Sequence, residues 1–179
     1  MMVNKIKKRL RDFCLECKDY LNSVKIVYVA GKYSIELSTR TLSDVIEKHV
    51  ISFAIDFFGK DNVKYGSWSG YDLIIIDLEG ETVYVNIKTN LLNPNMDGTW
   101  LFSASVIENL KQKRILEHLY CTKFEYTKEN NILKFISGKV AGPISSIPLI
   151  YYTKGEATDY KIRTEFNGTH CHILNKYYQ

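Results

Sequence analysis

One segment, residues 70–90, limits the possible folds of this chain more than any other. It reads GYDLIIIDLEGETVYVNIKTN. The four consecutive apolar residues at 73–76 predict a strand that is covered on both faces, because a half-exposed strand would alternate polar and apolar side chains. A turn at 78–80 and a second strand-like run follow. The segment therefore predicts a β-hairpin whose first strand lies near the centre of a sheet.

The register of this hairpin decides which polar side chains meet. We expect a three-residue loop with Gly80 in the left-handed conformation. The pairs are then Asp77 with Glu81, Ile76 with Thr82, Ile74 with Tyr84, and Asp72 with Asn86. Because side chains alternate along a strand, Asn86 and Lys88 would share one face of the sheet with Asp72. A two-residue loop would shift the register by one and place Asp72 on the opposite face.

The rest of the chain predicts helices and further strands around the hairpin. Helices are expected at 3–22, about 42–58 and about 103–119, a strand pair at 24–37, and strands within 124–153 and 158–178, with a turn at 129–131. Thr41 is expected to cap the second helix, with Asp44 completing a capping box, and Gly59 to end it. This order predicts an α/β fold in which a central mixed β-sheet is flanked by helices.

Composition narrows the class of protein without choosing a function. The chain has 179 residues, 45% hydrophobic and 25% charged, and only three prolines, so we expect one globular domain over 1–179. No run approaches the roughly 20 apolar residues of a membrane span, and the N-terminus lacks the apolar stretch of a signal peptide, which favours the cytoplasm. The net charge of +4 permits a polyanionic partner without requiring one.

Two other sequence patterns are weaker. Cys14 and Cys17 have the C-x-x-C spacing of metal and redox sites, but they fall within the first predicted helix and the second half of a zinc site is missing. We expect reduced thiols in the core or at the surface. The chain has no GxxxxGK[ST] phosphate loop, so no nucleotide cofactor is expected.

The polar residues of the hairpin suit the hydrolysis of a phosphodiester. This reaction needs a hard cation that polarises the phosphoryl oxygen and lowers the pKa of the attacking water. Mg²⁺ prefers oxygen ligands and is usually held by one or two carboxylates. Asp72 and the carbonyl of Ile87 can supply such oxygens, and Lys88 can orient or deprotonate the water and balance phosphate charge.

An Asp at a strand end, a hairpin, and then acid-x-Lys on the next strand resembles the signature of the PD-(D/E)XK nucleases, whose largest set is the type II restriction endonucleases. The match consists of Asp72, the 14-residue spacing, and Asn86-Ile87-Lys88. The resemblance covers about 42–120 and implies a restriction-endonuclease-like core in αβββαβ order. The helix at 3–22 and the C-terminal strands would be additions to it. It further implies Mg²⁺-dependent cleavage of double-stranded DNA at a short site, with Glu47 on the second helix as an acidic residue near the metal.

The chain departs from this signature at two positions. Tyr71 stands where the family often has Pro, at a variable position. Asn86 stands where the family has Asp or Glu, and a neutral amide is a poorer ligand for Mg²⁺. Three explanations are open. Asn86 is an engineered replacement that blocks cleavage, or it is natural and Glu47 supplies the second carboxylate, or the site is inactive.

Candidate DNA-binding residues surround the hairpin in sequence. Contacts to phosphates position a duplex, and contacts to bases read its sequence. Polar and aromatic side chains can make both kinds of contact. The candidates are Arg40, Ser67, Trp68, Ser69, Asn90, Asn93, Asn95, Met96, Ser103 and Ser105. Cutting both strands at one site favours two active sites related by a two-fold axis, so we expect a homodimer, with the 3–22 helix as a possible interface.

Two other functions stay open on sequence alone. The first is a structure-selective nuclease of the resolvase or repair type, which would use the same core and cut only branched or damaged substrates. The second is a non-catalytic DNA-binding module with a decayed site, which the neutral side chain of Asn86 suggests.

Overall fold

The computed structural model describes residues 2–32, 34–68, 70–92, 99–147, 150–152 and 161–165. Its elements in chain order are α1 (Met2–Val24), β1 (Val29–Ala30), β2 (Ile35–Glu36), α2 (Thr39–Phe58), η1 (Lys60–Asn62), β3 (Val63–Trp68), β4 (Tyr71–Leu78), β5 (Glu81–Leu91), β6 (Thr99–Ser103), α3 (Ala104–Gln112), η2 (Ile115–Glu117), β7 (Leu119–Glu129), β8 (Ile132–Ala141), η3 (Ile144–Ser146), β9 (Ile150–Tyr152) and β10 (Lys161–Glu165).

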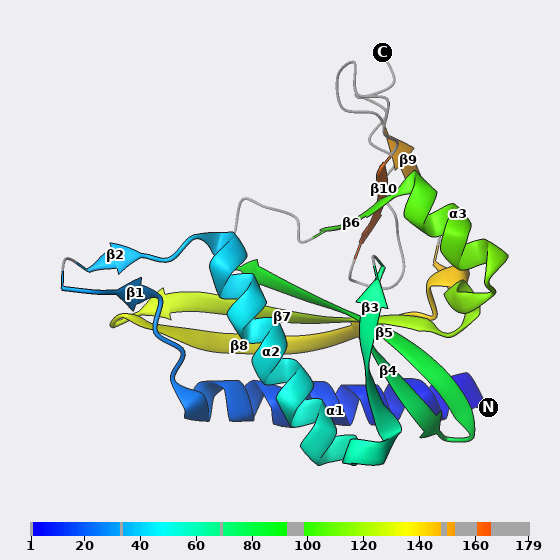
Figure 1. The fold of residues 1–179 in the computed structure, drawn as a ribbon, viewed down its shortest axis with the longest axis horizontal. Helices are drawn as coiled ribbons and strands as arrows, with labels where there is room; N and C mark the ends of the chain where they lie inside the picture. Colours follow the sequence, from blue (N-terminus) through cyan, green and yellow to red (C-terminus); the bar gives the residue numbers. More distant parts are fainter. Residues whose placement is uncertain are drawn as a thin grey trace.

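A five-stranded sheet in the order β3-β4-β5-β7-β8 forms the centre of the fold. Strands β5 and β7 are parallel, whereas the other neighbours are antiparallel. The predicted mixed sheet is therefore confirmed. The elements α2, β3, β4, β5, α3 and β7 come in the predicted αβββαβ order, with β6 of the smaller sheet inserted between β5 and α3. Strands β6, β10 and β9 form a separate three-stranded sheet that projects from the α3 end (Figure 1). The sequence analysis did not identify β3.

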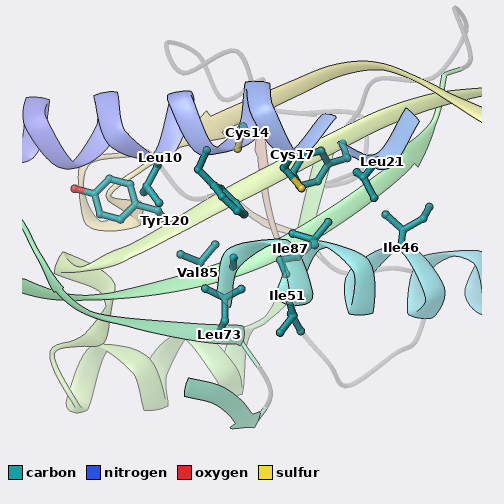
Figure 2. Packing of buried hydrophobic residues seen from close by; sticks show 14 of the residues in the cluster. Leu10, Cys14, Cys17, Leu21, Ile46, Ile51, Leu73, Val85, Ile87 and Tyr120 are labelled. Atoms are coloured by element: carbon teal, nitrogen blue, oxygen red, sulfur yellow. The ribbon is translucent and has the colours of Figure 1, made fainter. Parts of the chain in front are cut away.

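Helices α1 and α2 pack side by side against one face of the sheet. Helix α1 contributes an apolar stripe whose buried members recur at helical spacing: Ile6, Leu10, Phe13, Cys14, Cys17 and Leu21. Figure 2 shows this stripe meeting side chains from α2 and from the strands in one layer. Of the two expected places for Cys14 and Cys17, core or surface, the structure shows the core: both thiols are buried and free, and burial raises the pKa of both.

Among the described residues, α3 and η2 cover one end of the opposite face. Helix α3 and η2 place Ile107, Leu110 and Leu116 over Tyr71 and Tyr84 in a second, smaller apolar cluster. Here α3 ends at Gln112 and is followed by the short turn η2, so the prediction of a single helix to about 119 was wrong.

Helix α2 begins earlier than the sequence predicted. Ser38 is its N-cap, and the Ser38 hydroxyl accepts a hydrogen bond from the backbone N–H of Thr41 at 3.1 Å. The predicted cap at Thr41 was wrong because Ser38 offers the same chemistry three residues upstream, which adds a turn to the helix. Arg40 consequently lies inside the first turn, and Gly59 ends the helix as predicted, with a φ of 92°.

The β4–β5 hairpin reaches the predicted register by a different route. Leu78 pairs with Glu81, so the loop has two residues, Glu79 and Gly80, and both have positive φ as a tight hairpin turn requires. The predicted pairing of Asp77 with Glu81 was wrong. A β-bulge, with Asp77 at a φ of 57°, adds one residue to β4 between Ile75 and Leu78.

That bulge cancels the shift that a two-residue loop would otherwise cause. Ile74 still lies opposite Tyr84, and Leu73 opposite Val85. Asp72 therefore follows a register that places it on the face of Asn86, as predicted. Elsewhere, Asn130 and Asn131 form the predicted turn between β7 and β8, also with positive φ.

Within the described part of the chain, no helix combines the length and apolar character needed to cross a lipid bilayer.

Candidate active site

Asp72 lies where β4 separates from β5. The paired register of the two strands reaches Leu73 and Val85, and just beyond it the Asp72 carboxylate accepts a hydrogen bond from the backbone N–H of Ile87 at 2.5 Å. This bond fixes the carboxylate against β5, next to the peptide that joins Asn86 to Lys88. A short bond from a backbone N–H to a carboxylate is charge-assisted and holds the side chain in one geometry.

Asn86 is buried on the same strand, with only 3% of its surface exposed. It lies opposite Cys121 of β7, on the sheet face that α3 partly covers. Its Oδ1 has no hydrogen-bond partner among the described residues, a condition it shares with Thr122 Oγ1. A buried acceptor without a partner costs free energy. A cation or hydrogen-bond donor bound to the Asn86 oxygen would therefore stabilise the protein.

Glu47 approaches Asp72 and Lys88 from helix α2. Glu47, Ser43, Ile87, Lys88 and Thr89 line a pocket of about 180 Å³ between α2 and β5. The hydroxyls of Ser43 and Thr89 are 2.7 Å apart and join the helix to the strand. Helix and hairpin thus bring together residues that are about 40 positions apart in the sequence.

The charges of these residues act on one another. Burial raises the pKa of Asp72, and the Ile87 N–H and the Lys88 ammonium partly oppose that rise. Burial also raises the pKa of Glu47, and the carboxylates of Asp72 and Asp44 raise it further, while Lys88 and Lys48 lower it. The two carboxyl groups of Glu47 and Asp72 are therefore close enough to repel each other, and a cation between them would relieve that repulsion.

These residues suit a hard divalent cation better than a soft one. Across the described residues, no group of three or more His, Cys, Asp or Glu side chains is placed to hold a metal ion. Two carboxylates, the partnerless amide oxygen of Asn86 and the carbonyl of Ile87 are a donor set of oxygens only. Mg²⁺ takes such ligands and usually keeps several waters beside one or two carboxylates, so the residues present fit it.

The predicted DNA-binding residues are only partly described. Arg40 is exposed in the first turn of α2, and Asn90 is half-buried on β5, two residues beyond Lys88. Of Ser67, Trp68, Ser103 and Ser105 the structure describes the backbone alone, in β3, β6 and α3. Ser69, Asn93, Asn95 and Met96 lie outside the described residues.

The sequence analysis missed a charged cluster on β7 and β8. Lys123 and Glu125 are buried on β7, with 4% and 8% of their surfaces exposed. The signal was present in the alternation Lys123-Phe124-Glu125-Tyr126, in which the two aromatic residues enter the helix-covered core. Alternation places the two charged residues on the opposite face, the face of Asn86. What the local sequence could not show is that β7 lies beside β5.

Glu125 is the centre of this cluster. Its carboxylate contacts Lys123 Nζ at 2.9 Å and Lys139 Nζ at 2.8 Å, and it accepts a hydrogen bond from the Ser137 hydroxyl at 2.6 Å. Burial alone would raise the pKa of Glu125, but the bonds from Lys139, Ser137 and Lys123 outweigh it and lower the pKa to about 2. Glu125 is therefore ionised throughout the physiological range.

Replacing Glu125 by Gln should destabilise the protein in a pH-dependent way. Since the folded-state pKa is depressed, the carboxylate stabilises the fold above the ordinary Glu pKa of about 4.3, and that advantage is lost as the pH falls toward about 2. Urea unfolding of wild type and Glu125→Gln should differ at neutral pH and converge in acid. A difference that is independent of pH would contradict this account.

The arrangement of the elements defines the class of fold. A mixed sheet with α2 on one face, α3 on the other, and a hairpin whose strands separate at an acidic residue is a restriction-endonuclease-like fold. Among solved structures, the chain is similar to the NlaIV restriction endonuclease, with a TM-score of 0.60 and 12% sequence identity, over 89% of this chain and 68% of that chain. No family model matches the sequence, and no curated protein matches it.

Proposed function

We propose that this protein is a Mg²⁺-dependent endonuclease of the PD-(D/E)XK class that cleaves double-stranded DNA at a short site, as type II restriction endonucleases do. The observation that carries the proposal is the meeting of Asp72, Glu47 and Lys88 where β4 leaves β5, on the strand that also carries the buried oxygen of Asn86, which has no partner among the described residues. The restriction-endonuclease-like fold supports a nuclease function.

Each residue has a role that follows from its position. Asp72, Glu47, the Asn86 amide oxygen and the Ile87 carbonyl would hold the cation, and the Ile87 N–H keeps the Asp72 carboxylate in place. Lys88 would orient the attacking water and stabilise negative charge on the scissile phosphate. When bound, Mg²⁺ would polarise the phosphoryl oxygen and acidify a bound water.

The neutral side chain at position 86 is explained best by Glu47. Of the three explanations we prefer a natural Asn86. What supports it is that Glu47 lies close enough to Asp72 for the Asp72 carboxylate to raise the pKa of Glu47. The second acidic ligand would then come from α2 rather than from β5. Two copies related by a two-fold axis would cut both strands, so a homodimer is part of the same proposal.

A non-catalytic DNA-binding protein is the second candidate. The specific observation in its favour is again Asn86, because the loss of one carboxylate from a metal site is the expected first step of its decay. In this case Lys88 and Asp72 would serve only folding or DNA affinity.

Plasmid cleavage tests the proposal. Supercoiled plasmid is incubated with Mg²⁺ and wild-type protein, with Lys88→Met, and with Lys64→Met, an exposed lysine of β3, as the matched control. We expect discrete linear fragments from wild type and the control and none from Lys88→Met. Cutting restricted to branched substrates would favour the resolvase type, and random degradation would contradict restriction activity. No cleavage by wild type or by Asn86→Asp, together with retained DNA binding, would favour the second candidate.

A further inference from the structure

The sheet face that carries Asn86 changes character along the strands. Near η2 it is apolar, with Tyr84 and Cys121 packed under α3. Two residues further on, Lys88, Lys123 and Lys139 are partners of one another across β5, β7 and β8. The next row contains Asn90, Glu125 and Ser137. The candidate site therefore lies at the border between an apolar half and a charged half of the same face.

Lys139 differs from an ordinary surface lysine. Its side chain is 43% exposed, yet its ammonium is held at 2.8 Å by a carboxylate that is 10% exposed. That carboxylate, Glu125, is itself fixed by Ser137 and by the buried Lys123. By contrast Lys134, near the other end of β8, pairs at 3.3 Å with Glu129, and both of these side chains are about half exposed. Lys139 is thus a solvent-accessible cation whose position is set in advance.

Lysines opposite one another do not themselves favour folding, although Glu125 offsets their repulsion. Like charges opposite one another on neighbouring strands are destabilising, and replacing a buried ion pair by apolar residues is often neutral or stabilising. What the arrangement does supply is preorganisation, because a side chain that is already ordered loses less entropy when it binds an anion. The row that begins with Lys88 therefore passes through the buried Lys123 and ends at the solvent-accessible Lys139.

We propose that Lys139, backed by Lys123 and held by Glu125, binds a phosphate of the DNA backbone beside the cleavage site. Strands in a sheet are about 4.8 Å apart, so Lys139 lies about 10 Å from Lys88 across the sheet. A DNA strand advances about 3.4 Å along its axis per nucleotide, so the two lysines would contact phosphates within about three nucleotides of each other. Glu125 is a positioning residue in this site. The proposal rests on the DNA-directed function proposed above.

The salt dependence of DNA binding tests the contact. Binding of a fluorescent DNA duplex is followed by anisotropy without divalent metal, over a series of KCl concentrations. Each phosphate contact contributes about 0.9 to the slope of log K against log salt. We expect the slope of Lys139→Met to be smaller in magnitude than that of wild type by about 0.9. Lys139→Arg should keep the wild-type slope, because it retains the charge.

The control is Lys134→Met, which removes the same charge from the same strand and should leave the slope unchanged. Thermal unfolding identifies any variant that has lost its fold, and Lys139→Gln then replaces Lys139→Met. An unchanged slope in a folded Lys139 variant, or an equal loss in Lys134→Met, overturns the phosphate contact while Lys88-dependent plasmid cleavage still supports the nuclease. A wild-type protein that neither binds nor cleaves DNA overturns both proposals.

Discussion

Replacing Asp72 by Asn is expected to abolish metal-dependent DNA cleavage in a protein that remains folded. The amide oxygen can still accept the hydrogen bond from the Ile87 N–H, so the local geometry is kept. The negative charge that holds the cation is lost, together with several kcal/mol of transition-state stabilisation, which corresponds to a loss of roughly 10³-fold or more in the cleavage rate. Cleavage of plasmid under single-turnover conditions measures it.

Stability gives an independent measurement on the same variant. Because burial raises the pKa of Asp72, the fold disfavours its charged form, and the neutral Asn should leave the metal-free protein at least as stable as wild type at neutral pH. The rise in melting temperature that Mg²⁺ gives wild type should disappear. Asp77→Asn, at the exposed bulge of the same strand, is the matched control and should preserve cleavage and the Mg²⁺ effect. Undiminished cleavage by Asp72→Asn would refute the assignment of Asp72 to the metal.

Replacing Asn86 by Asp is expected to have the opposite effect on cleavage. A third carboxylate would join Asp72 and Glu47 at a position with 3% exposure, whose present amide oxygen has no partner within the described residues. Stronger binding of the cation should raise the cleavage rate roughly tenfold or more at limiting Mg²⁺, since each 1.4 kcal/mol of added binding is a factor of ten. Titration of the cleavage rate with Mg²⁺ measures the shift.

The same substitution should destabilise the protein without metal. Burying another carboxylate beside two whose pKa values are already raised is costly, so Asn86→Asp should melt at a lower temperature than wild type and show a larger stabilisation by Mg²⁺. Asn90→Asp, four residues along the same strand, is the control and should change neither quantity by a comparable amount. If Asn86→Asp gains no cleavage and Lys88→Met loses none, DNA binding alone becomes the better account.

The sequence predicted the hairpin and its shared face well because both follow from alternation over a few residues. The sequence did not predict the correct loop length. A two-residue loop with a bulge and a three-residue loop without one both pair Ile74 with Tyr84, so the pattern cannot distinguish them. The cap of α2 was misplaced by three residues because Ser38 and Thr41 are both competent caps. These are local ambiguities between arrangements of similar energy.

The row of lysines on β5, β7 and β8 could not be predicted from the sequence, for a different reason. The parallel pairing of β5 with β7 crosses a long connection, and no local pattern specifies which strands become neighbours. Lys123 and Glu125 could be recognised as an unusual pair on one strand, but their relation to Lys88 depends on that pairing. The reach of Glu47 toward Asp72 depends in the same way on how α2 packs on the sheet.

The bulge at Asp77 has a consequence for how such sites are recognised in other chains. It separates the length of the hairpin from the geometry of its open end, because an extra residue in β4 makes up for a shorter loop. Insertions and deletions near the tip can therefore accumulate in pairs without displacing the carboxylate or the ammonium. A fixed number of residues between Asp and Lys is consequently a poor search criterion. A better criterion is whether the two residues fall on the same face of the sheet once bulges and the loop length have been counted.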